Sequence, residues 1–156
     1  MSEHTLQPYQ ESFQDVILGT NDYAGELTIE IKPESLKTVC QTLKDQFGFN
    51  MLVDISAVDY YTDEKRFGVM YNMVSFPGRK RLRITVRLEE EDPRVESLVE
   101  GWQGAKWRER ECWDMMGIRF DGHPDHRRMF MPEDFQYFPM RKEFPLIGIP
   151  GSIQLP

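Results

Sequence analysis

Residues 67–88, FGVMYNMVSFPGRKRLRITVRL, decide the fold of this chain. Apolar and polar side chains alternate from residue 67 to residue 73, and again from residue 82 to residue 88. A period of two is typical of a strand that buries one face. Pro77 and Gly78 lie between the two runs and predict a turn. The stretch therefore predicts an antiparallel hairpin with one solvated face.

Further elements are expected before the hairpin. Residues 27–31 alternate in the same way and predict another strand. Apolar side chains at helical spacing predict a helix over residues 36–47, which Gly48 ends. Residues 51–61 are rich in apolar and β-branched side chains and predict a strand.

Two helices are expected after the hairpin. Pro93 opens a short predicted helix that carries Val95, Leu98 and Val99, before two glycines interrupt it. A second helix is predicted from Ala105 to Met116, ended by a glycine. This order predicts an α+β fold, in which helices pack on one face of a small mixed or antiparallel sheet of three or four strands.

The last part of the chain has a different composition. Residues 118–156 hold six of the ten prolines, three of the eleven glycines and six aromatic side chains. Prolines at this density exclude a single regular element, and so many aromatics are unusual in a solvated tail. We therefore predict an α/β domain over residues 1–118 and an extended strap over residues 119–156. The strap would lie on another surface, either of its own domain or of a partner subunit.

Composition excludes several classes of protein. The 156 residues carry a net charge of −7, which argues against a nucleic-acid-binding face. The acidity is confined to residues 1–63, with a net charge of −8, and indicates a solvated face or a surface that selects a basic partner. Two cysteines and three histidines leave little material for a metal or iron–sulfur centre. No secretory signal or membrane helix is visible, so we expect a reducing compartment and free thiols.

The predicted helix 105–116 carries a carboxylate on its apolar face. Glu109 shares that face with four other side chains, and an unpaired buried carboxylate is costly. We expect a structural ion pair that docks the strap on the helix, and a proton-relay or catalytic acid, or a pair at the surface, are the alternatives. The members of the apolar face are Ala105, Glu109, Cys112, Trp113 and Met116, and the basic candidates in the strap are Arg127, Arg128, Arg141 and Lys142.

The other faces of this helix are polar. Arg110, Glu111 and Asp114 lie there, and Arg110 and Asp114 are four residues apart, so a weak pair along the helix is expected. Cys112 is interpreted as a small buried apolar residue. No order of residues indicates a catalytic triad, although spatial triads need no motif.

The stretch 121–126, DGHPDH, raises the question of a metal site. His123 and His126 with two aspartates could bind zinc in principle. Pro124 prevents a continuous helix from presenting both histidines on one face. A turn, with His123 bonded to a backbone carbonyl, is the preferred interpretation.

Closely spaced motifs fill residues 107–148. They are ERECWDMMGI at 109–118, Phe120, GHPD at 122–125, Arg127-Arg128, PED at 132–134 and PMRKEFPL at 139–146. Together they resemble the signature of the thirty-kilodalton subunit, also called the C subunit, of the proton-pumping NADH–quinone oxidoreductase, respiratory complex I. His126 and Tyr137-Phe138 depart from the usual pattern, which bears on the local path of the strap.

The resemblance implies a peripheral subunit of the hydrophilic arm with no redox cofactor and no active site of its own. FMN and iron–sulfur clusters would lie in partner subunits, and the chain would pack against the large quinone-site subunit (the D subunit) and near iron–sulfur subunits. Membrane association, at the cytoplasmic side of the cell inner membrane, would come through partners. The resemblance marks as structural or interface residues Glu109, Arg110, Glu111, Asp114, Gly117, His123, Pro124, Arg127, Arg128, Arg141, Lys142, Phe144 and Pro145.

Two other functions stay open. The first is the equivalent subunit of a related membrane-bound hydrogenase or of a ferredoxin- or deazaflavin-linked dehydrogenase. The second is a small stand-alone enzyme with Glu109 and His123 as acid and base.

Overall fold

The computed structural model describes residues 7–61 and 63–149. The expectations for the first six residues and for the last seven residues of the strap lie outside this range. The elements follow in the order α1 (Gln7–Phe13), β1 (Ile17–Tyr23), β2 (Glu26–Ile31), a 3-10 helix η1 (Pro33–Ser35), α2 (Leu36–Phe47), β3 (Met51–Asp59), β4 (Phe67–Ser75), β5 (Lys80–Leu88), β6 (Arg94–Glu96), α3 (Ala105–Met116) and β7 (Arg119–Asp121).

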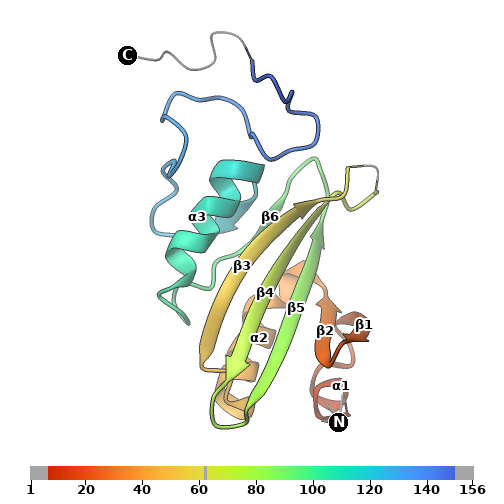
Figure 1. Cartoon of the computed structure of the whole chain (residues 1–156). Coiled ribbons are helices and arrows are strands. Elements are labelled where there is room, and N and C mark those ends of the chain that lie inside the picture. Colours follow the sequence, from red (N-terminus) through yellow and green to blue (C-terminus); the bar gives the residue numbers. More distant parts are fainter. Residues whose placement is uncertain (1–6, 62, 150–156) are drawn as a thin grey trace.

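Five strands form one mixed sheet in the order β1-β2-β5-β4-β3 (Figure 1). The predicted hairpin is confirmed, because β4 and β5 pair antiparallel from Phe67 opposite Leu88 to Ser75 opposite Lys80. β2 runs parallel to β5, while β1–β2 and β3–β4 are antiparallel. The fold is α+β and the sheet is mixed, as the sequence predicts, but the sheet has five strands instead of the expected three or four.

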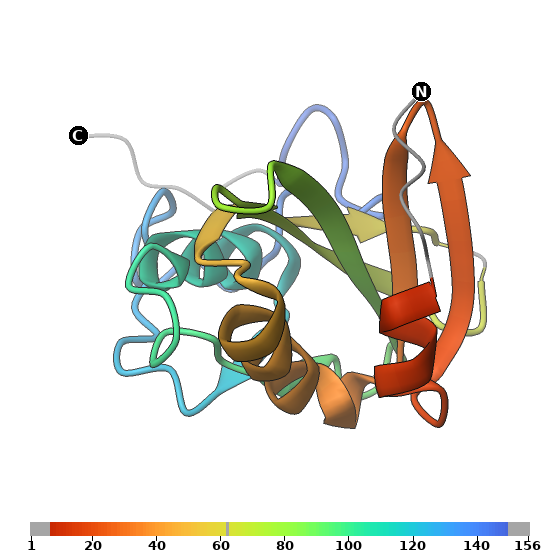
Figure 2. The ribbon, with the colours of Figure 1, turned by 90° about the horizontal axis from the view of Figure 1, so that it is seen from below.

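The helices lie on one side of this sheet. Figure 2 shows α1 and α2 below the strands, and α3 beside the edge strand β3. The core lies between the sheet and α2, where each fully buried aliphatic side chain contributes about 1.5–3 kcal/mol. The face of β4 and β5 turned to the viewer in Figure 1 carries no helix within residues 7–61 and 63–149. Inward residues of β2, β4, β5 and α2 are Leu27, Ile29, Ile31, Val69, Tyr71, Met73, Leu82, Ile84, Val86, Leu36, Val39, Cys40 and Leu43.

The prediction of a short helix after Pro93 is wrong. Arg94–Glu96 instead form β6, which pairs parallel with β7. The N–H of Arg119 donates to the carbonyl of Pro93 over 2.8 Å, and the N–H of Ser97 donates to the carbonyl of Asp121 over 2.9 Å. This pairing with a segment more than twenty residues away overrides the helical spacing of the apolar side chains. β6 and β7 thus precede and follow α3 along the chain and pair with each other.

The predicted strap begins with a strand. β7 occupies residues 119–121, and its Phe120 is buried in the core. From residue 122 to residue 149 the chain forms neither helix nor strand. Within residues 7–61 and 63–149, none of the helices has the length and the apolar character of a membrane-spanning helix.

Candidate functional site

The strap folds back over α3 and the adjoining end of the sheet (Figure 1). Phe135 is its buried aromatic anchor, and Phe144 packs on it with ring centroids 6.2 Å apart. Main-chain contact is also direct, since the N–H of Met140 donates to the carbonyl of Met115 over 3.1 Å. Buried carboxylates on the domain hold this irregular segment in place at two points.

Asp114 of α3 is the first anchor and is fully buried. Its Oδ2 accepts the consecutive main-chain N–H groups of Met129, Phe130 and Met131, at 3.0, 2.6 and 3.1 Å. Its Oδ1 accepts Nη1 of Arg128 over 2.9 Å. Burial raises the pKa of Asp114, but the Phe130 N–H, the Arg128 guanidinium and the other two N–H groups outweigh burial and hold the pKa below its usual range. Asp114 is therefore an ionised hub for the strap.

Asp59, at the end of β3, is the second anchor. Arg66 donates to both of its oxygens, with Nε–Oδ1 at 2.9 Å and Nη2–Oδ2 at 2.8 Å. The main-chain N–H of Lys142 donates to the same Oδ2 over 2.8 Å, and Glu143 also pairs with Arg66. The Arg66 hydrogen bonds, against burial, hold the pKa of Asp59 well below its usual range. The bidentate pair is nearly buried and ties the strap to the sheet.

Sequence reasoning missed Asp59 and Arg66. A signal was present, because Asp59 continues the inward register of Ile55 and Ala57 on β3. A carboxylate at an inward position needs a partner, which must be either a cation or a set of N–H donors. Arg66 immediately precedes β4, whose first residue pairs with Asp59.

Gly117 marks the place where the strap crosses the end of α3. It caps the helix with φ at 78°, in the left-handed region that glycine adopts without strain. A Cβ at this position would lie 2.7 Å from Nη2 of Arg141 and 2.7 Å from the Phe138 ring. Arg141 donates from Nε to the carbonyl of Met116 over 2.8 Å and lies over the rings of Phe67 and Phe138. A glycine is thus required both for the turn and for the close approach of the strap.

Glu109 does not form the predicted ion pair with the strap. It is fully buried, and its carboxylate accepts the Ser97 hydroxyl over 2.6 Å and the N–H of Leu98 over 2.7 Å. Burial raises the pKa of Glu109 to about 7, although both hydrogen bonds lower it. The prediction of a buried carboxylate is confirmed, but the partner is the turn before α3. With no exposed surface, Glu109 serves the core rather than a substrate.

His123 occupies the predicted turn. Its Nδ1 accepts the N–H of Asp125 over 3.0 Å, so Nε2 carries the proton and donates to the carbonyl of Lys106 over 3.0 Å. The predicted bond to a backbone carbonyl is confirmed. Burial, with His126 and Arg110 nearby, lowers the pKa of His123 and keeps the ring neutral. Nε2 of His123 lies 4.0 Å from Oε2 of Glu109.

The second histidine also contacts main chain. His126 Nε2 lies 2.8 Å from the carbonyl of Phe120. No group of three or more His, Cys, Asp or Glu side chains within the described ranges could hold a metal ion. Both cysteines are buried and free, and burial raises the pKa of Cys112 to about 12.

Arg110 and Asp114 do not pair with each other, so that prediction is wrong. Arg110 turns toward the strap and donates to the carbonyls of Arg127 and Arg128 over 3.1 and 3.0 Å. Its Nη1 also lies 3.6 Å from Oδ2 of Asp125. The strap therefore packs on the polar faces of α3 that carry Arg110 and Asp114.

The remaining predicted residues lie nearer the surface. Glu111 is half-buried and pairs with Arg108 over 3.2 Å, and Arg127 is exposed and pairs with Asp125 over 2.9 Å. The Lys142 side chain is exposed, so its contact with the domain is made by main chain. Pro124 and Pro145 are exposed, and Phe144 is half-buried.

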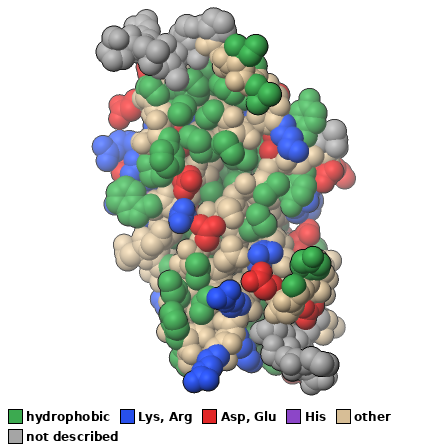
Figure 3. Space-filling view, in the orientation of Figure 1, with side chains coloured by type: hydrophobic (Ala, Val, Ile, Leu, Met, Phe, Trp, Pro, Cys, Tyr) green, Lys and Arg blue, Asp and Glu red, His purple; other side chains and the backbone are tan. Residues whose placement is uncertain are grey.

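The outer surface of the strap is apolar. Leu146 and Ile147 are almost fully exposed, at 106% and 98%, and Phe130 and Met140 are each 58% exposed. Figure 3 shows hydrophobic side chains gathered over the upper half of this face, where α3 and the strap lie. Exposed apolar patches of this kind mark interaction sites.

Comparison with known proteins shows the family. A sequence model described as "Respiratory-chain NADH dehydrogenase, 30 Kd subunit" matches residues 29–149. The chain belongs to the 30 kDa subunit family of the respiratory-chain NADH dehydrogenase. The fold class and the family that the sequence predicts are both confirmed.

Several members of the 30 kDa subunit family are similar over most of this chain. The C subunit of NADH-quinone oxidoreductase from Geotalea uraniireducens is 39% identical over 139 residues, which cover 89% of this chain and 85% of that protein. The C subunit of the same oxidoreductase from a Roseiflexus species is 40% identical over 143 residues, with 90% and 82% covered.

Solved structures agree with this assignment. A structure described as "Nqo5 of the trypsin-resistant fragment (1-134)" matches with a TM-score of 0.69 and 34% identity, covering 77% of this chain and 98% of that one. A chain in the membrane-bound sulfane sulfur reductase, an archaeal respiratory membrane complex, matches with a TM-score of 0.73, covering 91% and 84%. At 18% identity, the second match shows the fold alone.

Proposed function

We propose that this chain is a non-catalytic structural subunit of the hydrophilic arm of a complex I-type NADH:quinone oxidoreductase. It helps to hold the large quinone-site subunit to the electron-transfer arm and adjoins iron–sulfur subunits. The complex as a whole transfers electrons from NADH to quinone and couples this transfer to proton translocation. The relatives that are 39% and 40% identical are named as the C subunit of that oxidoreductase, which supports this assignment.

The observation that carries the proposal is the strap. An irregular segment with fully exposed Leu146 and Ile147 would be costly in water, yet Asp114 and Asp59 fix it on the domain. A preordered apolar surface loses less conformational entropy when a partner covers it. The basic residues Arg128 and Arg141 are engaged in internal contacts and position this surface.

The chemistry belongs to the partners in this proposal. FMN and iron–sulfur clusters reside in other subunits, and this chain contributes position, not electron transfer. The peripheral location, at the cytoplasmic side of the inner membrane, follows from attachment to those subunits.

A pull-down of the tagged chain from its native membranes tests the proposal. We expect stoichiometric co-purification of the quinone-site and iron–sulfur subunits, and no flavin or iron–sulfur absorbance in the chain purified alone. Replacing Leu146 and Ile147 by serine should weaken co-purification while leaving the melting temperature unchanged. A cofactor bound one-to-one by the isolated chain, or co-purification of hydrogenase subunits instead, would contradict the assignment.

A further inference from the structure

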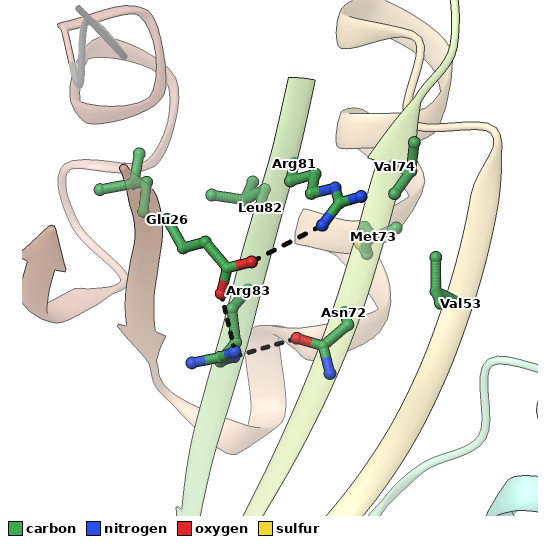
Figure 4. A pocket seen from close by; sticks show the side chains of 9 residues that line it. Glu26, Val53, Asn72, Met73, Val74, Arg81, Leu82 and Arg83 are labelled. Atoms are coloured by element: carbon green, nitrogen blue, oxygen red, sulfur yellow. Dashed lines mark hydrogen bonds and ion pairs between the residues drawn. The ribbon is translucent and has the colours of Figure 1, made fainter. Parts of the chain in front are cut away.

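A groove of about 300 Å³ lies on the sheet face that carries no helix among the described residues. Val53 of β3 and Val74 of β4 contribute apolar surface to it, and Arg81 and Arg83 of β5 line its other side. Figure 4 shows Glu26 of β2 reaching between these two arginines. The groove is far from the strap in the fold, because it lies toward the β4–β5 hairpin end of the sheet.

The arginines of the groove are only partly neutralised. Glu26 Oε2 lies 3.1 Å from Nη2 of Arg83, whose Nε also donates to Oδ1 of Asn72 over 2.9 Å. The other oxygen of Glu26 is 3.8 Å from Nη1 of Arg81, too far for a hydrogen bond. The Arg81 side chain is 75% exposed, so its donors face water.

The hairpin tip adds more positive charge beside the groove. Arg79 and Lys80 are exposed and have no ionic partner among the residues described. Lys80 is opposite Ser75 and therefore points to the α2 side of the sheet, so Arg79, Arg81 and Arg83 are the three cations near one carboxylate, in a chain whose net charge is −7. The N–H of Gly78 donates to the Ser75 hydroxyl over 3.1 Å and stabilises the turn at the tip. Figure 3 shows Lys and Arg side chains at the lower end of this face.

We propose that this groove binds an acidic segment of a second subunit of the complex. The segment carries a carboxylate beside an aliphatic side chain: the carboxylate meets Arg81, and the aliphatic group covers Val53 and Val74. Charge complementarity selects the partner, since a positive surface on an acidic chain attracts an acidic segment and repels a basic one. The inference rests on the proposed function only in taking the partner from the same complex.

Selective labelling tests whether the groove is covered. The native cysteines are buried, so a Val53→Cys variant offers one reactive thiol in the groove. The control is Thr38→Cys, at an exposed position of α2 behind the sheet. In the isolated chain both thiols should react with maleimide at similar rates. In the purified complex we expect the thiol at position 53 to react at least tenfold more slowly than in the isolated chain. Equal rates at position 53 in chain and complex would overturn the proposal.

Cross-linking identifies the occupant. A photo-reactive cross-linker on the thiol at position 53, followed by mass spectrometry of the complex, should yield a peptide of another subunit that contains Asp or Glu beside Leu, Ile or Val. A cross-link to a basic segment, to lipid or to a second copy of this chain would contradict the inference.

Charge reversal tests the electrostatic part. An Arg79→Glu/Arg81→Glu double variant should bind the remaining subunits about tenfold more weakly at low salt, with the difference shrinking as salt rises. The matched control, Lys65→Glu/Arg119→Glu, reverses two exposed charges on other parts of the surface and should bind like the wild type. Equal binding by the two double variants at low salt would refute an acidic partner.

The outcomes separate this inference from the proposed function. If the wild-type chain assembles with the quinone-site subunit but position 53 stays reactive, only the groove proposal fails. If the wild-type chain does not assemble with that subunit, the proposed function fails.

Discussion

Replacing Asp114 by Asn should release the strap. The carboxylate accepts three main-chain N–H groups on one oxygen and the Arg128 guanidinium on the other. An Asn side chain keeps one oxygen, and if this oxygen stays with the N–H groups, its NH2 group faces the guanidinium. Two donors then oppose each other, and Arg128, whose side chain is only 8% exposed, loses its anion. Breaking a buried pair in this way costs about 3–5 kcal/mol.

The cost is large compared with the stability of a typical domain, which is about 5–15 kcal/mol. If the substitution destabilises the whole domain by this amount, the melting temperature drops by roughly 6–20 °C for a domain near this size. If the strap opens alone, the open population rises on the order of 100-fold to several thousand-fold. Because the ionised form is favoured in the fold, this stabilisation is present above pH ~4 and is lost as pH falls below that value.

Trypsin digestion separates the two cases. The strap offers Arg127, Arg128, Arg141 and Lys142 as cleavage sites, and cleavage tracks the open population when opening is fast. Asp134→Asn is the control, because Asp134 is exposed in the same segment and should change stability by less than about 0.5 kcal/mol. The reasoning is refuted if Asp114→Asn is cleaved in the strap less than fivefold faster than this control and melts at the same temperature.

Three further predictions concern the domain and the strap. Gly117→Ala should lower the free energy of thermal unfolding by about 2–3 kcal/mol, because alanine is strained in the left-handed backbone and its Cβ meets the Phe138 ring. Gly48→Ala, at the similar cap of α2 but without a contact to the strap, should cost about 1 kcal/mol. Equal losses in the two variants would show that the contact with the strap contributes nothing. Folding raises the pKa of Glu109 from near 4.5 to about 7, so the stability of the wild type should fall by at most roughly 3 kcal/mol as pH rises from 4.5 to 7. Glu109→Gln should remove this part of the pH dependence, measured by chemical denaturation. Parallel stability profiles of the wild type and the variant against pH would contradict this. Arg66→Met should cost about 3–5 kcal/mol in chemical denaturation, because the buried carboxylate of Asp59 loses its cation. Adding Asp59→Asn to Arg66→Met should recover part of this loss, and additive losses would argue against a coupled pair.

Local patterns predicted much of the domain. The hairpin 67–88, the strand 27–31 and both twelve-residue helices lie where alternation, helical spacing and glycine caps predict them, and the strand predicted over residues 51–61 ends two residues earlier, at Asp59. Strand β1 escaped notice because its residues, ILGTNDY, form an exposed edge with little apolar alternation. The spacing of Val95, Leu98 and Val99 fits a helix, but Arg94–Glu96 form a strand because they pair with the distant β7. Long-range pairing of this kind leaves no local pattern.

The candidate site was predicted less completely. Helical spacing correctly buries Glu109, but its partners Ser97 and Leu98 lie in a turn that the sequence does not reveal. Arg110 and Asp114 lie on polar faces of the predicted helix, and the spacing of apolar residues cannot show that an irregular segment will cover those faces. The family signature, in contrast, marks Asp114, Gly117 and Arg141, which the structure places at the contacts between α3 and the strap.

The two buried aspartates bind the strap mainly through its main-chain N–H groups. Asp114 and Asp59 accept N–H groups of residues 129–131 and 142, and every amino acid except proline offers that donor. The side chains at these four positions are therefore free to change without loss of the attachment, provided that proline is avoided. Evolution can then tailor the outward chemistry of the strap to whichever neighbour a given enzyme supplies, while its path over the domain stays constant. The two buried carboxylates thus conserve the conformation of the strap, while its binding specificity can change independently.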